Sequence, residues 1–505
     1  MGRRIDGSEG TEDTSPLQFV KYFLGIVWLL SNGSLIGKAD SIPCRQSLWS
    51  NLYHSGCLFD RTLSSRASSA ARKDQPSRQG HMSGIAEIIE LDKLPEDILH
   101  HIHALVPLRD AAHAACVSHR FLRSWRRFPN LAFNWETFGL SMNTGTIDER
   151  AKKLADGIHH ILGNHSGNGV KTLKIPVHAC GNFVTASRLE LWLQATVKSG
   201  IVELDLDPPR DHGPKYKFPC SLLSCAASSL RTLSLSYCVF QPTLRLGSFI
   251  NLKSVCLVLV HITEVDLGSL FSCAVSLEKF EISQCDGITF LKIPSNLQLF
   301  SFLRVFLCRR LQSIEICAPK ISTFLFSGPP MKISIRDSSH LKSITMNGVG
   351  YCGMFQYALT KLHLIASNLQ DLTLLSSGEA GQSFIATQDP SILKDSNANP
   401  LDLRRIPEFH HDALKKVTIT GFCSSKSLIE LTRQILGNCS SLKCLVLDTT
   451  TGYNNTGRCQ SMDTNAVKKA LEGVEAIEKY IKANVPSTVN LEVLGPCYKC
   501  HISTL

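Results

Sequence analysis

The chain has 505 residues, more than one hydrophobic core usually organises, so its length predicts two or three domains. Its content of 43% hydrophobic and 19% charged residues excludes disorder along the full length. The 33 glycines and 21 prolines show no three-residue period, which excludes a collagen-like fibre. The net charge of +10 permits a nucleic-acid or acidic partner without indicating either.

The 19 cysteines are odd in number and scattered singly, unlike the grouped cysteines of a small secreted disulfide framework. Most lie in apolar runs beside leucine and serine, where cysteine behaves as a small buried hydrophobic residue. This usage favours a reducing compartment, and we expect the protein in the nucleus or the cytoplasm.

Residues 1–81 lack amphipathic periodicity and are expected to form a disordered extension. The apolar run Tyr22–Leu30 measures only about 14 Å as a helix, about half of a bilayer core. Acidic residues near the start, among them Asp6 and Glu9, contradict a signal or transit peptide. We therefore expect no membrane association.

Residues 91–125 predict three short helices. Pro95 suits a first helical turn, Pro107 ends that helix, and Ser118 is a plausible N-cap for the third helix. A second helix is expected over residues 110–115. Such a small motif cannot cover its own apolar surface, so part of it must meet a second domain or a partner. The first helix carries an apolar stripe at helical spacing, made of Ile98, Leu99, Ile102 and Leu105.

The order of these residues resembles the F-box of plant F-box proteins with leucine-rich repeats. The resemblance rests on Leu94-Pro-x-Asp-Ile-Leu, Pro107-Leu-Arg-Asp-Ala-Ala, Val117-Ser-x-x-Phe and Trp125, and it places the F-box at residues 85–133. It implies a Skp-type adaptor as partner and, through that adaptor, cullin and RING subunits. The positions that it implies for adaptor binding are Leu94, Pro95, Ile98, Leu99, Ile102, Leu105, Leu108, Val117, Ser118 and Trp125.

Three histidines, His100, His101 and His103, crowd the first helix. His100 and His103 are three residues apart and therefore share a helix face, but no Cys or carboxylate partner is evident, so no metal site is predicted. We expect all three to be solvated.

A template of apolar-x-x-apolar-x-apolar recurs through residues 165–400 and beyond, which predicts an irregular leucine-rich-repeat solenoid. Its early spacings are near those of leucine-rich repeats, and from Phe302 they shorten to 9 and 10, which indicates a degenerate solenoid. The copies begin at Val170, Ile201, Leu230, Leu252, Leu277, Phe302, Leu311, Ile321, Leu341, Leu369, Leu414 and Leu442.

Within each copy, alternation should turn the last two apolar side chains inward and the residues beside them outward. Stacking then aligns the outward side chains on one face, the candidate surface for an unknown protein target. Their mostly neutral character, without clustered basic residues and aromatics, does not indicate nucleic acid. The candidate target-binding residues are Thr232, Ser234, Lys279, Glu281, Ser313, Glu315, Ser343 and Thr345.

Residues 401–500 predict an α/β cap. A strand, a turn at Gly421, a helix ending at Gly437 and a second strand are followed by a helix over residues 464–482 and a final strand. The segment resembles the FBD-type domain that ends many plant F-box proteins, through Leu414-Lys-Lys-Val, Gly421-Phe and Leu447-Asp-Thr. The fold class predicted for the chain is α/β: a three-helix F-box, a repeat solenoid and this C-terminal cap.

The last motif, Cys497-Tyr-Lys-Cys500-His501, has the spacing of c-type haem attachment. Because no export signal or surrounding helical pocket accompanies it, we expect a pair of surface thiols, or at most a weak metal site, and no cofactor.

No phosphate loop, nucleophile elbow or other catalytic constellation is evident, so we expect a protein that is not an enzyme. The resemblance implies the substrate-recognition subunit of a Skp–cullin–F-box E3 ubiquitin ligase, whose partners perform the chemistry. The alternative is a repeat scaffold or binding protein outside any ligase, whose helical motif is structural. A pull-down with the adaptor distinguishes the two.

Overall fold

The computed structural model describes residues 94–141, 143, 145–208, 215–242, 249–337, 339–348, 357, 367–375, 410–450 and 462–497. The predictions for residues 1–81 and for Cys500 and His501 lie outside these ranges. The chain divides into two compact units, residues 1–201 and 202–505. Among the residues described, no helix has the length and apolar character needed to cross a membrane.

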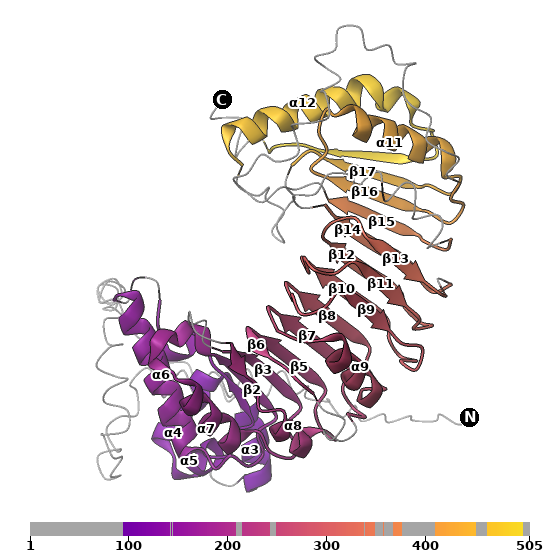
Figure 1. The fold of residues 1–505 in the computed structure, drawn as a ribbon. Helices are drawn as coiled ribbons and strands as arrows, with labels where there is room; N and C mark the ends of the chain where they lie inside the picture. Colours follow the sequence, from indigo (N-terminus) through magenta and orange to yellow (C-terminus); the bar gives the residue numbers. More distant parts are fainter. Residues whose placement is uncertain are drawn as a thin grey trace, which may run out of the picture. The chain divides into compact units, whose positions relative to one another are not determined.

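The three predicted helices open the described part of the first unit (Figure 1). They are α3 (Glu96–Ala104), α4 (Leu108–Val117) and α5 (His119–Trp125). Pro95 precedes α3 and its carbonyl accepts the first helical hydrogen bond, from Leu99 N at 3.0 Å. The Ser118 hydroxyl accepts a bond from Arg120 N, which confirms the predicted N-cap. Because Pro107 serves as the N-cap residue of α4, that helix begins earlier than predicted.

The rest of the first unit combines helices with two parallel strands. Leu131 and Leu173 lie opposite each other where the two strands pair, and both are buried. The side chains of Thr146 and Glu149 form a reciprocal capping box at the start of the helix over residues 147–164. The elements are β1 (Asn130–Ala132), η4 (Glu136–Phe138), α6 (Ile147–Asn164), β2 (Thr172–Pro176), η5 (Val177–Phe183) and α7 (Ala186–Thr196).

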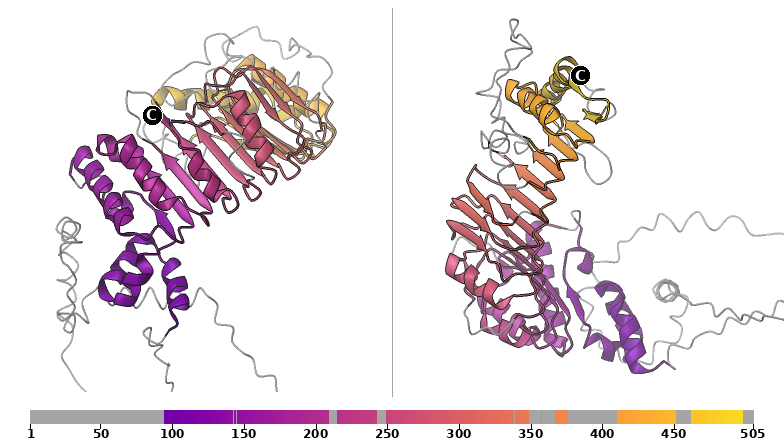
Figure 2. Two further views of the ribbon diagram at one scale, coloured as in Figure 1. Left: turned by 60° about the horizontal axis from the view of Figure 1, so that its bottom comes forward. Right: turned by 90° about the vertical axis from the view of Figure 1, so that its right-hand side faces the viewer.

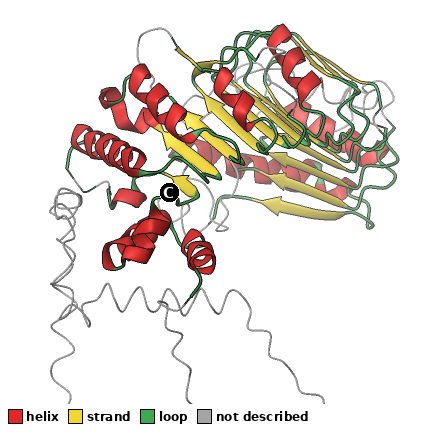
Figure 3. Cartoon of the chain, turned by 90° about the horizontal axis from the view of Figure 1, so that it is seen from below, coloured by secondary structure: helices red, strands yellow, loops and turns green. Residues whose placement is uncertain are grey.

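The second unit is a solenoid of parallel strands, which confirms the predicted fold class (Figures 1 and 2). Its main sheet stacks the strands in chain order, each in register with the next. Among these repeats most of the described connections are loops, and helices are short (Figure 3). The main-sheet strands are β3 (Glu203–Asp207), β5 (Thr232–Ser236), β7 (Ser254–Val258), β8 (Lys279–Ser283), β10 (Phe302–Phe306), β12 (Thr323–Ser327), β14 (Ser343–Asn347), β15 (Asp371–Leu375), β16 (Lys416–Thr420), β17 (Cys444–Asp448) and β18 (Asn490–Leu494).

A second parallel sheet explains the short spacings in the sequence. It contains β9 (Phe290–Ile293), β11 (Ser313–Ile316) and β13 (Lys332–Ile335), which alternate along the chain with main-sheet strands. The template copy at Leu311 therefore belongs to the second sheet. Main-sheet strands from β5 to β14 recur about every 20–25 residues, the usual leucine-rich range. The repeats do not shorten; the coils of β8, β10 and β12 each gain a second strand.

Four short elements complete the repeats: β4 (Tyr216–Lys217), α8 (Ser221–Ala226), β6 (Cys238–Val239) and α9 (Glu264–Cys273). β4 and β6 pair with each other in parallel.

The predicted alternation is confirmed along strands such as β5, β7, β8 and β14, where buried and half-buried residues alternate. The copy at Phe302 is the exception, because two overlapping templates occur there. Register with β8 sets Leu303 opposite Phe280, so Leu303 is buried and Phe302 turns outward. The correct copy begins at Phe300, two residues earlier.

Buried thiols extend the template beyond the strands. Cys285 and Cys308 each follow a template copy, and their thiols donate to the carbonyls of Leu257 and Ile282 in the preceding coil, at 3.7 and 4.0 Å. Burial raises the pKa of Cys285 to about 12 and that of Cys308 to about 11. These cysteines fill the Asn/Cys position of a leucine-rich repeat. Cys225, in contrast, is exposed.

The C-terminal elements follow the predicted order, with α11 (Lys426–Asn438) and α12 (Thr464–Tyr480) between the last strands. Gly421 has φ of +73°, which suits the predicted turn, while Gly437 lies inside α11 instead of ending it. On α12, Val467 and Ile477 are buried, whereas Leu471 is 37% exposed.

Candidate functional site

The first helix of the three-helix motif has two apolar faces. Leu99 and Ile102 point inward and pack in a core with Val106, Ala114 and Phe121. Ile98 and Leu105, seven residues apart and therefore on one face, are 45% and 51% exposed. The predicted single stripe is therefore wrong: its members divide between the core and the surface.

The ten positions proposed for adaptor binding occupy different environments. Only the exposed and half-buried ones can contact a partner directly, whereas the buried ones support the motif from inside. Pro95, Ile98 and Leu105 are exposed, Leu94 and Ser118 are half-buried, and Leu99, Ile102, Leu108 and Trp125 are buried; the side chain of Val117 lies outside the description.

The expectation that all three histidines are solvated is wrong for His103, whose side chain is fully buried. Its Nε2–H donates to the Ala111 carbonyl at 2.9 Å, so in the neutral ring Nδ1 accepts from the Ser124 hydroxyl at 2.8 Å. The Ser124 oxygen in turn lies 2.9 Å from His100 Nδ1, which donates to it. Burial lowers the pKa of His103 to about 4. This histidine joins all three helices.

On the repeat unit, the candidate target-binding residues do not share one face. Six of them point outward from the main sheet, but Ser313 and Glu315 lie on β11 of the second sheet. There Glu315 forms ion pairs with Arg336 at 2.9 Å and Lys292 at 3.5 Å. The Cys317 thiol and these cations hold the pKa of Glu315 below its ordinary value. Glu315 therefore acts as a link between neighbouring coils. The six that remain together, all half-buried, are Thr232, Ser234, Lys279, Glu281, Ser343 and Thr345.

The sequence interpretation missed the outward residues of β10. Arg304 is exposed and lies 3.3 Å from Glu281, and its guanidinium stacks 5.4 Å from the Phe306 ring. The ammonium group of Lys279 lies 4.9 Å from the ring centre of Phe302. Aromatic and arginine side chains dominate the energetics of protein interfaces. The alternation Phe302-x-Arg304-x-Phe306 was a signal for this cluster, hidden by the misplaced template.

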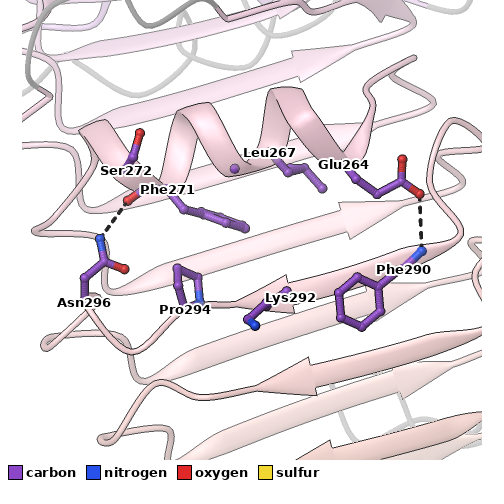
Figure 4. A pocket seen from close by; sticks show the side chains of 9 residues that line it. Glu264, Leu267, Phe271, Ser272, Phe290, Lys292, Pro294 and Asn296 are labelled. Atoms are coloured by element: carbon purple, nitrogen blue, oxygen red, sulfur yellow. Dashed lines mark hydrogen bonds between the residues drawn. The ribbon is translucent and has the colours of Figure 1, made fainter.

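A shallow hollow of about 360 Å³ lies between α9 and β9 (Figure 4). Leu267, Phe271 and Phe290 supply most of its wall. The Glu264 carboxylate at its rim accepts bonds from Thr289 N at 2.7 Å and from Phe290 N at 3.4 Å, which lowers its pKa. This carboxylate is occupied in joining the helix to the strand.

In the described ranges, no three His, Cys, Asp or Glu side chains group as metal ligands. Cys497 is half-buried, and its two motif partners lie outside those ranges.

Curated relatives of the chain are F-box proteins of Arabidopsis thaliana. F-box protein At5g03100 is 20% identical over 209 residues, which cover 41% of this chain and 61% of the relative. Putative F-box/LRR-repeat protein At3g18150 is 24% identical over 276 residues, 54% of this chain and 55% of the relative. The chain thus matches less than two thirds of each.

Among solved structures, a chain from the Rad7 and Elc1 complex in yeast is 12% identical to this chain. The match covers 78% of this chain and 90% of the yeast chain. The TM-score of this comparison is 0.24.

Two family models match the sequence. The F-box domain matches residues 91–133, which include α3, α4 and α5. The At1g61320/AtMIF1 LRR domain matches residues 161–395 and 382–498, well over half of the chain. The chain therefore carries an F-box domain and belongs to the At1g61320/AtMIF1 leucine-rich-repeat family.

Proposed function

We propose that this protein is the substrate-recognition subunit of a Skp–cullin–F-box E3 ubiquitin ligase, working in the nucleus or the cytoplasm. The F-box binds a Skp-type adaptor, and the adaptor connects it to cullin and RING subunits. The chain is not itself an enzyme. It holds a target near the activated ubiquitin and so raises the effective concentration of the target lysine.

The observation that carries this proposal is the outward face of α3. Ile98 and Leu105 leave about half of their surface in water, with the exposed His101 between them on the same face. Full burial of such a side chain stabilises by about 1.5–3 kcal/mol, so covering the exposed half contributes about 1 kcal/mol each. Together they supply about 30-fold in adaptor affinity.

The repeat region supplies the target surface in this proposal. The outward cluster of Phe302, Arg304 and Phe306, with Lys279 and Glu281 beside it, combines aromatic area with charge, which is typical of interface centres. We assign the F-box to residues 85–133, the solenoid to 165–400 and an FBD-like domain to 401–500. The FBD-like assignment rests on sequence resemblance alone.

The test is co-purification of the full chain with a Skp-type adaptor. Ile98→Lys combined with Leu105→Lys places two charges in the contact and should abolish binding. Leu94→Ala with Pro95→Ala, at the turn before α3, should weaken it. The matched control is Ile147→Lys, because Ile147 is 73% exposed at the start of another helix of the same unit.

The alternative, a repeat scaffold outside any ligase, expects a different result. In that case the wild-type chain ignores the adaptor, and the α3 changes alter only the stability of the motif. Circular dichroism of each variant separates lost docking from lost folding. Adaptor binding that survives Ile98→Lys with Leu105→Lys would show that the outward face of α3 is not the docking surface.

A further inference from the structure

At the end of the main sheet where its strands begin, the residues that precede successive strands form a row. We call this end of the strands an edge. The residue before each strand donates its backbone N–H to the equivalent carbonyl of the preceding coil. Gln370 N bonds Lys342 O at 2.9 Å, Lys415 N bonds Gln370 O at 2.8 Å, and Lys443 N bonds Lys415 O at 2.8 Å. With neighbouring strands about 4.8 Å apart, Lys342 and Lys443 lie only about 15 Å apart along the edge.

This edge concentrates positive charge. Four exposed lysines lie here: Lys342, Lys415, Lys416 and Lys443. Among the described residues, none of their ammonium groups forms an ion pair, and Lys415 Nζ donates to the Gln370 amide oxygen at 3.3 Å. Lys415 and Lys443 occupy adjacent coils, and like charges in that relation weaken a sheet. The repulsion between Lys415 and Lys443 therefore does not stabilise the fold, whereas a bound anionic partner would be attracted to both charges. We name this group the basic edge: Lys342, Lys415, Lys416 and Lys443, all exposed.

The surface beside the basic edge is neutral and able to form hydrogen bonds. Thr345, Thr373 and Thr418 lie in register on β14, β15 and β16, and all three are half-buried on the outward side of the sheet. Asp371 lies in register with Lys416. Among the described residues of this surface, no aromatic side chain is present on which bases could stack. These features fit a peptide better than a nucleic acid.

We propose that the basic edge binds an acidic segment of a protein, whose carboxylates meet the lysines while its chain crosses the threonine row. This inference deepens the proposed role of the repeats, because it gives the target a chemical class. It does not depend on adaptor docking by the F-box.

The experiment uses the purified full-length chain and a fluorescent oligoglutamate 12-mer, measured by anisotropy at low salt. Lys415→Glu with Lys443→Glu should weaken binding at least about fivefold, since each reversal replaces an attraction by a repulsion. Lys152→Glu with Lys468→Glu changes the net charge equally at exposed helix positions, and it should change affinity less than twofold. Raising the salt concentration should weaken wild-type binding.

Two results would overturn the inference. One is equal weakening by the two double variants, which would show a response to net charge only. The other is tighter binding of a single-stranded oligonucleotide than of oligoglutamate, with loss in the Lys415/Lys443 variant, which would make the edge a nucleic-acid surface. Adaptor co-purification of the same variants is the independent readout: its absence from the wild type refutes the ligase role while leaving the peptide result intact.

Discussion

Acid should loosen the F-box through a single buried histidine. The ordinary pKa of histidine is about 6.5, and in the folded motif the pKa of His103 falls to about 4. Between these values the unfolded state binds the proton and the folded state does not, so the free energy of unfolding decreases as the pH falls. From pH 7 to pH 4 the loss amounts to about 3 kcal/mol.

The structure gives the reason for this cost. Protonation puts a hydrogen on His103 Nδ1, which accepts from the Ser124 hydroxyl in the neutral state. The hydroxyl hydrogen must then turn away from His103 and loses its acceptor. The charge would also lie among the rings of Phe121 and Phe128, whose centres are 5.2 and 5.5 Å from that of the imidazole. In the described part of the chain, the hydrogen-bond partners of His103 are Ser124 and Ala111, and neither is a carboxylate.

The assay is hydrogen exchange of the amides in α3, α4 and α5, corrected for the intrinsic rate, because it reports opening of this motif separately from the repeats. His103→Gln is the reference variant, since glutamine can donate to the Ala111 carbonyl but cannot titrate. Carboxylates titrate alike in both proteins, so the difference between their pH profiles isolates His103. The same decrease in both proteins would refute the reasoning.

Three further predictions concern the repeat unit and the C-terminal helices. Leu303→Ala should lower the free energy of unfolding, measured in urea, by about 2–5 kcal/mol. Leu325→Ala, on the outward side, should lower it by much less. The reverse order would show that the template copy begins at Phe302 after all. Gly473→Ala should destabilise by about 1–3 kcal/mol, because its Cβ would lie 2.8 Å from a backbone oxygen. Gly163→Ala meets open space and should be neutral or stabilising in the same thermal melts. Cys285 should resist iodoacetamide at pH 8 until guanidinium unfolds the chain, as mass spectrometry can measure; rapid native labelling would contradict its burial and raised pKa.

Elements governed by nearby residues could be predicted from the sequence. The Ser118 N-cap, the turn at Gly421 and the alternation in strands such as β5 follow from local backbone chemistry and from periods of two or 3.6 residues. The F-box motif was found in the same way, because its proline, serine and apolar positions are read along one short stretch of chain.

The candidate sites depended on more distant neighbours. Periodicity put Ile98 and Leu99 on one stripe, but only packing against α4 and α5 decided that Leu99 enters the core and Ile98 stays in water. His103 looked solvated because the Ser124 hydroxyl and the Ala111 carbonyl that satisfy it come from other helices.

In this protein the sequence by itself determined the three N-terminal helices, most main-sheet strands with their apolar side, and the order of the C-terminal elements, because those features follow local patterns along the chain. Tertiary structure alone decided that Glu315 belongs to a second sheet, that Leu303 replaces Phe302 in the core, and that lysines far apart in sequence meet at the basic edge. The physical reason is that parallel coils bring together residues about 20 or more positions apart. Their register is fixed by pairing between strands, and no local pattern contains that information.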